Sequence, residues 1–130
     1  MAAHTEYIPG VCNIGTEEIR RRRNSGVLAL GFTAVLFIGL FAMDASPWWF
    51  AILFLPSAAA AISLLQASFR FCVYFGLFAL FNFGRGGETT RVASERAKSI
   101  DRAAAIRMIT YGMAVAATFT SLAVLLAANR

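Results

Sequence analysis

Hydrophobic positions along this chain form long unbroken runs, and most of the polar positions lie between them. Three of the runs carry no charge: Gly26 to Met43, Pro47 to Phe69, and Met108 to Ala128. Crossing about 30 Å of hydrocarbon takes about 20 helical residues, so uncharged runs of this length are candidate spans. We therefore predict three transmembrane helices, at residues 26–44, 47–69 and 108–128.

The composition agrees with lipid as the main solvent of these runs. Apolar residues make up 58% of the 130 residues, and the mean hydropathy is +0.64. A typical soluble domain is about 45–50% apolar, and a chain this small has too little interior to bury a larger share. The alternative, a soluble bundle, would need three helices that are hydrophobic on every side. The predicted fold class is an all-α membrane protein.

A fourth apolar run, "FCVYFGLFALF", follows the second span but is too short to cross a bilayer. As a helix it would be about 16 Å long, at about 1.5 Å per residue. Its aromatic residues recur at helical spacing and its other face is apolar too, so lipid or protein must cover it. We predict a short interfacial or re-entrant helix at residues 71–82, ended by the glycines of "NFGRGG".

The segment "ETTRVASERAKSIDRAAAIRM" alternates acidic and basic residues at helical spacing. It predicts a charged helix at residues 89–107 that runs into the third span. Pairs of opposite charge three or four residues apart stabilise such a helix: Arg91 with Glu95, Glu95 with Lys98, and Lys98 with Asp101. Two interpretations stay open, a solvated helix above the membrane and a contact with anionic lipid.

The leader, residues 1–25, is expected to be ordered. "YIPGVCNIG" carries a proline turn and two glycines, and "GTEEIRRRR" resembles the start of a helix. Thr16 is the expected cap, with two acids near the positive end of the helix dipole. The expected organisation is this leader followed by a three-span domain, residues 26–130.

The distribution of charge predicts how the chain is oriented. The net charge is +5 and the isoelectric point about 10.0. Positive charges gather in two places: Arg20, Arg21, Arg22 and Arg23 before the first span, and Arg70, Arg85, Arg91, Arg96, Lys98, Arg102 and Arg107 between the second and third. The positive-inside rule then places the N-terminus in the cytoplasm and the C-terminus outside. A rival helix over residues 61–83 would bury Arg70 near mid-bilayer, so we reject it.

Several of these residues are expected at the membrane interface. Arginine can extend its charge to the interface from a helix end, and tryptophan and tyrosine favour the headgroup level. The predicted interface residues are Arg20, Arg21, Arg22, Arg23, Trp48, Trp49, Arg70, Tyr74 and Arg85.

Four motifs together resemble a known group of proteins. "YIPGVCNIG" with "EIRRRR", then "FCVYFGLFALFNFG" and "DRAAAIRM", is similar to a family of small, uncharacterised bacterial integral membrane proteins. The similarity covers most of the chain, and its most specific elements are "CNIG" with "EI.RR", and "FNFG". The resemblance implies a multi-pass protein of the inner (cytoplasmic) membrane. It implies no catalytic residue and no cofactor.

The residue types argue against an enzyme. His4 is the only histidine, so a Ser–His–Asp catalyst is not expected. Cys12 and Cys72 are the only cysteines, and both fall on the cytoplasmic side, where disulfides are rare. His4, Cys12 and Cys72 are weak candidates for a metal site, because no ligand spacing supports one. The spans contain no acid, base or histidine of the kind that transporters place at mid-membrane. We expect no cofactor and no nucleic-acid partner.

Three functions follow as hypotheses. The first is a non-enzymatic accessory, assembly or scaffold subunit, or a homo-oligomer, packed through small-residue helix faces. The second is a small transporter or lipid-binding protein that uses the aromatic helix, with its ligand between residues 71–83 and the third span. The third is a thiol or metal sensor at Cys12 and Cys72. Membrane lipid and a membrane-protein partner are the expected partners. The candidate partner-binding residues are Tyr7, Pro9, Cys12, Asn13, Phe75, Phe78 and Asn82.

Overall fold

The computed structural model describes residues 6–83 and 89–130, and within them the chain is mainly helical. The elements are α1 (Thr16–Ala42), η1 (Pro47–Leu53), α2 (Phe54–Phe69), α3 (Val73–Phe78), β1 (Leu80–Phe81), β2 (Thr90–Arg91) and α4 (Glu95–Ala128). Three helical stretches are long and apolar enough to cross a membrane: Thr16–Ala42, Pro47–Phe69 and Glu95–Ala128. The predicted fold class, an all-α membrane protein with three spans, is confirmed.

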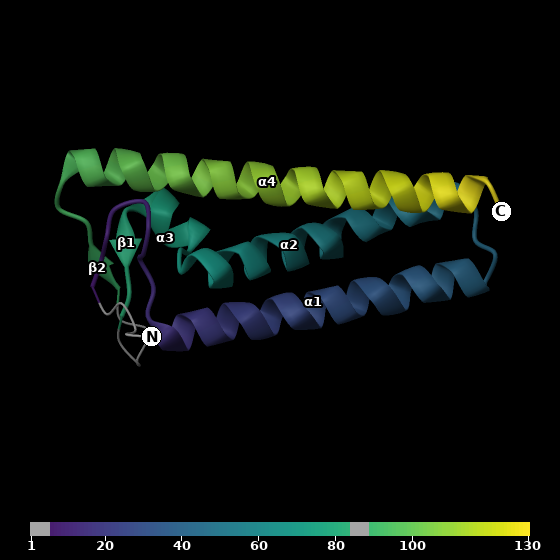
Figure 1. Cartoon of the computed structure of the whole chain (residues 1–130), viewed down its shortest axis with the longest axis horizontal. Helices are drawn as coiled ribbons and strands as arrows, with labels where there is room; N and C mark the ends of the chain where they lie inside the picture. Colours follow the sequence, from purple (N-terminus) through teal and green to yellow (C-terminus); the bar gives the residue numbers. More distant parts are fainter. Residues whose placement is uncertain (1–5, 84–88) are drawn as a thin grey trace.

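The three long helices run side by side along the length of the molecule, with α2 between α1 and α4 (Figure 1). The chain reverses direction between successive spans. The start of α1 and the start of α4 therefore lie at one end, together with α3 and the two strands. Arg130 lies at the opposite end, as an odd number of crossings requires.

Small residues let α2 pack closely against both neighbours. A Cβ added at Gly26 of α1 would lie 2.8 Å from Leu64 Cγ, and one at Gly112 of α4 would lie 2.4 Å from Ile62 Cγ1. Each glycine therefore sits where a side chain of α2 touches the backbone of the neighbouring helix. This is the close approach that small residues permit between transmembrane helices.

The end of the bundle at Arg130 is closed by that arginine. Its guanidinium lies 3.2 Å from Asp44 Oδ1 and donates hydrogen bonds to the carbonyls of Phe41, at 3.0 Å, and Ala45. Trp48 and Trp49 are both exposed nearby, at the start of η1. Their predicted place at the membrane interface agrees with this exposure but stays a prediction.

The first helix is longer than its predicted span. The leader helix and the first span form one continuous helix that begins at Thr16. Gly15 is the N-cap residue and no side-chain capping bond forms there, so Thr16 is not the cap that the sequence predicted. Glu17 and Glu18 do lie in the first turn, where acids are favourable.

The predicted helix at residues 71–82 is shorter in the structure. Only Val73–Phe78 is helical, because Ala79 adopts a left-handed conformation (φ 56°, ψ 50°) that ends the helix. The next two residues form β1, which pairs antiparallel with β2. The glycine turn of "NFGRGG" that was expected to end this helix lies mostly outside the described residues.

The charged helix also begins later than predicted, at Glu95 instead of residue 89. Ser94 is its N-cap, and its Oγ accepts a hydrogen bond from the backbone N–H of Ala97 at 3.3 Å. Of the three predicted ion pairs, Glu95 with Lys98 is present at 2.6 Å. Arg91 lies in β2 and is not helical, and Asp101 faces the interior, so the other two predicted pairs were wrong.

Candidate functional site

Residues 6–15, 70–83 and 90–101 fold together at one end of the bundle, and we call this assembly the cap. The leader threads through it and reaches the α2–α3 turn, the segment after β1, and α4. Residues 6–15 of the leader are therefore packed into this end of the fold.

A tight turn opens the cap. The backbone N–H of Val11 donates to the carbonyl of Ile8 at 3.0 Å, and Ile8 and Cys12 exchange two further backbone bonds of 2.9 Å. Proline at the second position and glycine at the third are typical of a type II turn. Gly10 has φ +71°, and a Cβ there would lie 2.6 Å from Ile100 Cγ2. Both the turn and its packing on α4 therefore require glycine at this position.

Asn13 joins the leader to the turn between α2 and α3. Its side-chain amide donates to the carbonyl of Cys72 at 3.1 Å, and its Oδ1 accepts from the Cys72 N–H at 2.7 Å. Its backbone bonds Arg70 on one side and Asn82 on the other. Asn13 is 0% exposed, so every one of these bonds is made away from water, where an unmade bond costs most.

Asp101 anchors the leader to α4. The hydroxyl of Tyr7 donates to Asp101 Oδ2 at 2.5 Å, and the N–H of Gly10 donates to Oδ1 at 2.6 Å. Asp101 is 0% exposed. Burial raises the pKa of Tyr7 well above its usual value, and the hydrogen bond to Asp101 and the charge of that carboxylate raise it further. Tyr7 thus stays protonated and serves as a donor to a buried acceptor.

The two cysteines are buried, unpaired thiols with different partners. Cys12 Sγ donates to the carbonyl of Ile14 at 3.7 Å, whereas Cys72 Sγ accepts from Arg22 Nη2 at 3.2 Å. Burial raises the pKa of Cys12, which disfavours the reactive thiolate. Within residues 6–83 and 89–130, no group of three metal-ligating side chains gathers. His4, the third weak metal candidate, lies outside the described residues.

The arginine run at the start of α1 is divided between the surface and the cap. Arg20 and Arg21 are largely exposed and pair with Glu17, at 3.6 Å, and Glu18, at 3.1 Å. Arg22 is more buried and lies between Glu18, at 3.8 Å, and the sulfur of Cys72. Arg23 is exposed. Of the four arginines in this run, three are therefore exposed at the surface, and their predicted place at the membrane interface stays a prediction.

The candidate partner-binding residues mostly form the inside of the cap. Cys12, Asn13, Phe75 and Asn82 are buried, and Tyr7 stacks on Phe81 with ring centroids 4.8 Å apart. Pro9 is partly exposed, and Phe78 is 61% exposed. Of these seven residues, Phe78 alone has a mostly exposed side chain, so the group as a whole supports the fold of the cap.

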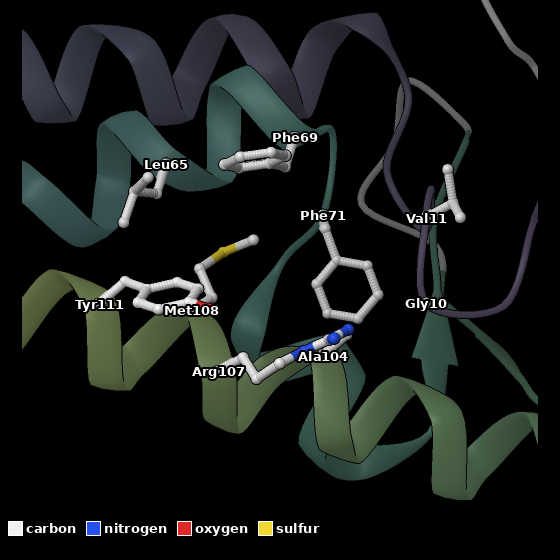
Figure 2. Close-up of a pocket in the computed structure, with 9 residues that line it drawn as sticks. All are labelled: Gly10, Val11, Leu65, Phe69, Phe71, Ala104, Arg107, Met108 and Tyr111. Carbon is white, nitrogen blue, oxygen red and sulfur yellow. The ribbon is translucent and has the colours of Figure 1, made fainter.

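A pocket of about 330 Å³ opens beside the cap, between α2 and α4. Figure 2 shows Leu65 and Phe69 on α2 facing residues of α4, with Phe71 standing between the two helices. Gly10 and Val11 of the leader lie near its cap end. The lining residues are Gly10, Val11, Leu65, Phe69, Phe71, Ala104, Arg107, Met108 and Tyr111. This pocket lies between Phe71 and α4, the region where the second hypothesis expects a ligand.

Two residues that matter for the cap were missed by reasoning from the sequence. The sequence pattern pairs Asp101 with Lys98, and it assigns no role to Gln66, which lies within the second predicted span. Gln66 Oε1 in fact accepts from the N–H of Val73 at 3.0 Å, at the start of α3. For Asp101 a signal existed, because it falls at helical spacing with Ala97, Ala104 and Met108 on the buried face.

Comparison with known proteins gives no relative: no family model, no curated protein and no solved structure matches this chain.

Proposed function

We propose that this multi-pass membrane protein is a non-enzymatic accessory, assembly or scaffold subunit that associates within the membrane through α1. The observation that carries the proposal is the exposure of that helix. Its buried residues are Glu18, Gly26 and Thr33, out of 27 residues in the helix. The outward side of α1 is thus left for lipid or for another helix.

Two glycines on that outward side favour another helix as the partner. A Cβ added at Gly31 or at Gly39 would meet nothing within 4 Å, in contrast to Gly26, which packs against Leu64. Glycine within a helix costs about 0.5–1 kcal/mol relative to alanine. No contact within the described part of the chain offsets that cost at Gly31 and Gly39, whereas close approach by a second helix would.

The burial of the polar groups of the cap supports a role without catalysis. Asn13 and Asp101 are fully buried and hydrogen-bonded to the chain itself, and Glu18 is paired with two arginines. Polar groups engaged in this way stabilise one conformation of the cap and are not free to act on a substrate.

The orientation belongs to the same proposal. The cap end carries both basic segments, while the other end carries Asp44 and Arg130, paired with each other. We place the cap in the cytoplasm of a bacterial inner membrane. A membrane-impermeant maleimide applied to intact cells should then label Ser46→Cys but not Ser99→Cys. The reverse pattern would reject this orientation.

The association is tested by purifying the tagged chain from its native membrane in gentle detergent and measuring the mass of the complex. The wild-type chain should elute with a second copy or with a stoichiometric membrane protein, which mass spectrometry identifies. Gly31→Leu with Gly39→Leu should release the chain without changing its thermal unfolding. Ala117→Leu, a matched enlargement on the exposed side of α4, should leave the complex intact. A wild-type chain that elutes alone would overturn the proposal.

A further inference from the structure

The pocket between α2 and α4 combines an apolar lining with one positive charge. Leu65, Phe69, Phe71 and Met108 line it with hydrocarbon and aromatic rings, and Arg107 contributes the charge. No carboxylate is among the residues that line it. Its volume, about 330 Å³, falls at the lower end of the range of about 300–1,000 Å³ that is typical of ligand pockets.

Arg107 has no partner among residues 6–83 and 89–130. Five cations of the described residues form ion pairs: Arg20 with Glu17, Arg21 and Arg22 with Glu18, Lys98 with Glu95, and Arg130 with Asp44. Arg107 makes no ion pair or hydrogen bond in the described part of the chain. An anion held at the pocket would therefore meet an arginine that no carboxylate of residues 6–83 and 89–130 neutralises.

The pocket lies at the level where the membrane surface is expected. Phe69 is the last residue of α2, and Met108 begins the third uncharged run. Arg107 directly precedes that run, so its charge belongs at the headgroup level. Met108 and Tyr111 follow it along α4 and therefore lie deeper in the membrane. Figure 2 shows Arg107, Met108 and Tyr111 following one another along this helix.

We propose that this pocket binds an anionic phospholipid, with its phosphate on Arg107 and one acyl chain against Leu65, Phe69 and Met108. The unpaired guanidinium matches a phosphate in charge and in geometry. Tyr111, which is 62% exposed, carries a hydroxyl donor about one helical turn deeper than Arg107. A water-soluble anion would leave the apolar lining unused, and an uncharged lipid would leave Arg107 unpaired. This inference does not depend on association through α1.

The test is native mass spectrometry of the 130-residue chain, titrated with phosphatidylglycerol or with diacylglycerol, which has no phosphate, of the same acyl chains. The wild-type chain should bind phosphatidylglycerol more tightly. A basic residue near anionic lipid contributes about 1 kcal/mol, so Arg107→Gln should weaken phosphatidylglycerol binding about fivefold. Arg102→Gln, the same change at an exposed residue of α4 outside this pocket, should change it less than about twofold on the same scale.

Three results would overturn the proposal. Equal losses in Arg107→Gln and Arg102→Gln would indicate diffuse attraction to the basic end of the molecule. Equal affinity of the wild-type chain for the two lipids would show that the charge of Arg107 does not contribute to binding. Displacement of the lipid by glycerol 3-phosphate at the same concentration would show that the acyl chain contributes nothing. Thermal unfolding of each variant checks that the fold is intact. A further variant, Leu65→Phe, narrows the pocket without removing charge and should weaken binding of both lipids.

Discussion

Asn13 and Cys72 are 59 residues apart in the sequence and exchange two hydrogen bonds, one in each direction between the amide side chain and the peptide backbone. The asparagine amide carries a donor and an acceptor side by side, which match the carbonyl and the N–H of Cys72. The bonds fix the leader against the turn that connects the second span to α3. The cap therefore folds as one unit with the membrane helices.

Replacing Asn13 should destabilise the protein strongly. Asn13→Ala removes two buried hydrogen bonds and leaves the N–H and carbonyl of Cys72 without these partners, so a loss of about 2–4 kcal/mol is expected. Thermal unfolding in detergent measures the loss. Asn24→Ala, at an exposed position of α1, should change stability by less than about 0.5 kcal/mol. Similar unfolding of the two variants would contradict the role given to Asn13.

The bond between Tyr7 and Asp101 predicts a dependence on pH. In the unfolded chain Tyr7 loses its proton near pH 10, whereas the folded protein retains it because the pKa is raised. The unfolded state then binds fewer protons, so the contribution of Tyr7 to the free energy of unfolding falls as the pH rises above about 10 and is constant below that. Tyr7→Phe should lower stability by about 1–3 kcal/mol at neutral pH and reduce the loss at alkaline pH. The measurement is chemical unfolding of both proteins across this range, and parallel pH curves would contradict the prediction.

Replacement by alanine should have opposite effects at two glycines: Gly112, which packs against α2, and Gly31, on the outward side of α1. Gly112→Ala should destabilise the protein by about 1–3 kcal/mol, because the new Cβ would overlap Ile62. Gly31→Ala, with nothing within 4 Å, should be neutral or stabilise the chain by up to about 1 kcal/mol.

A double variant separates overlap from other causes at this position. Ile62→Ala with Gly112→Ala should be more stable than the sum of the two single losses predicts. Thermal unfolding of the four proteins provides the comparison. Strict additivity would indicate that the Cβ added at position 112 does not overlap the side chain of Ile62.

The spans were predictable from the sequence because their signal is local and strong. Length and the absence of charge located all three crossings, since lipid imposes the same requirement on every residue of a span. The clustering of arginines likewise predicted that one end of the molecule would be basic. The ends of the helices were less predictable, because a charged segment of the same composition can form the first turns of a helix or an extended segment before it.

The cap shows why the remaining detail was not predictable. Residues 89–94 were expected to be helical, but Thr90 and Arg91 pair with β1, and the N–H of Val92 donates to the carbonyl of Ala79 at 2.8 Å. Ala79 is left-handed, a conformation that alanine rarely adopts and that no local pattern signals. Contacts between distant segments decide both features. The same is true of Asn13 and Asp101, whose partners lie far away in the sequence.

The central claim, association through α1, is tested most directly inside the native membrane. A photo-activated cross-linking residue at position 35 replaces Val35, which is 70% exposed and lies one turn from both Gly31 and Gly39. The same residue at position 125 replaces Leu125, which is exposed on α4. We predict an adduct of defined mass, with a second copy or one other protein, from position 35 and none from position 125. Adducts of equal yield from both positions, or none from either, would contradict association through α1.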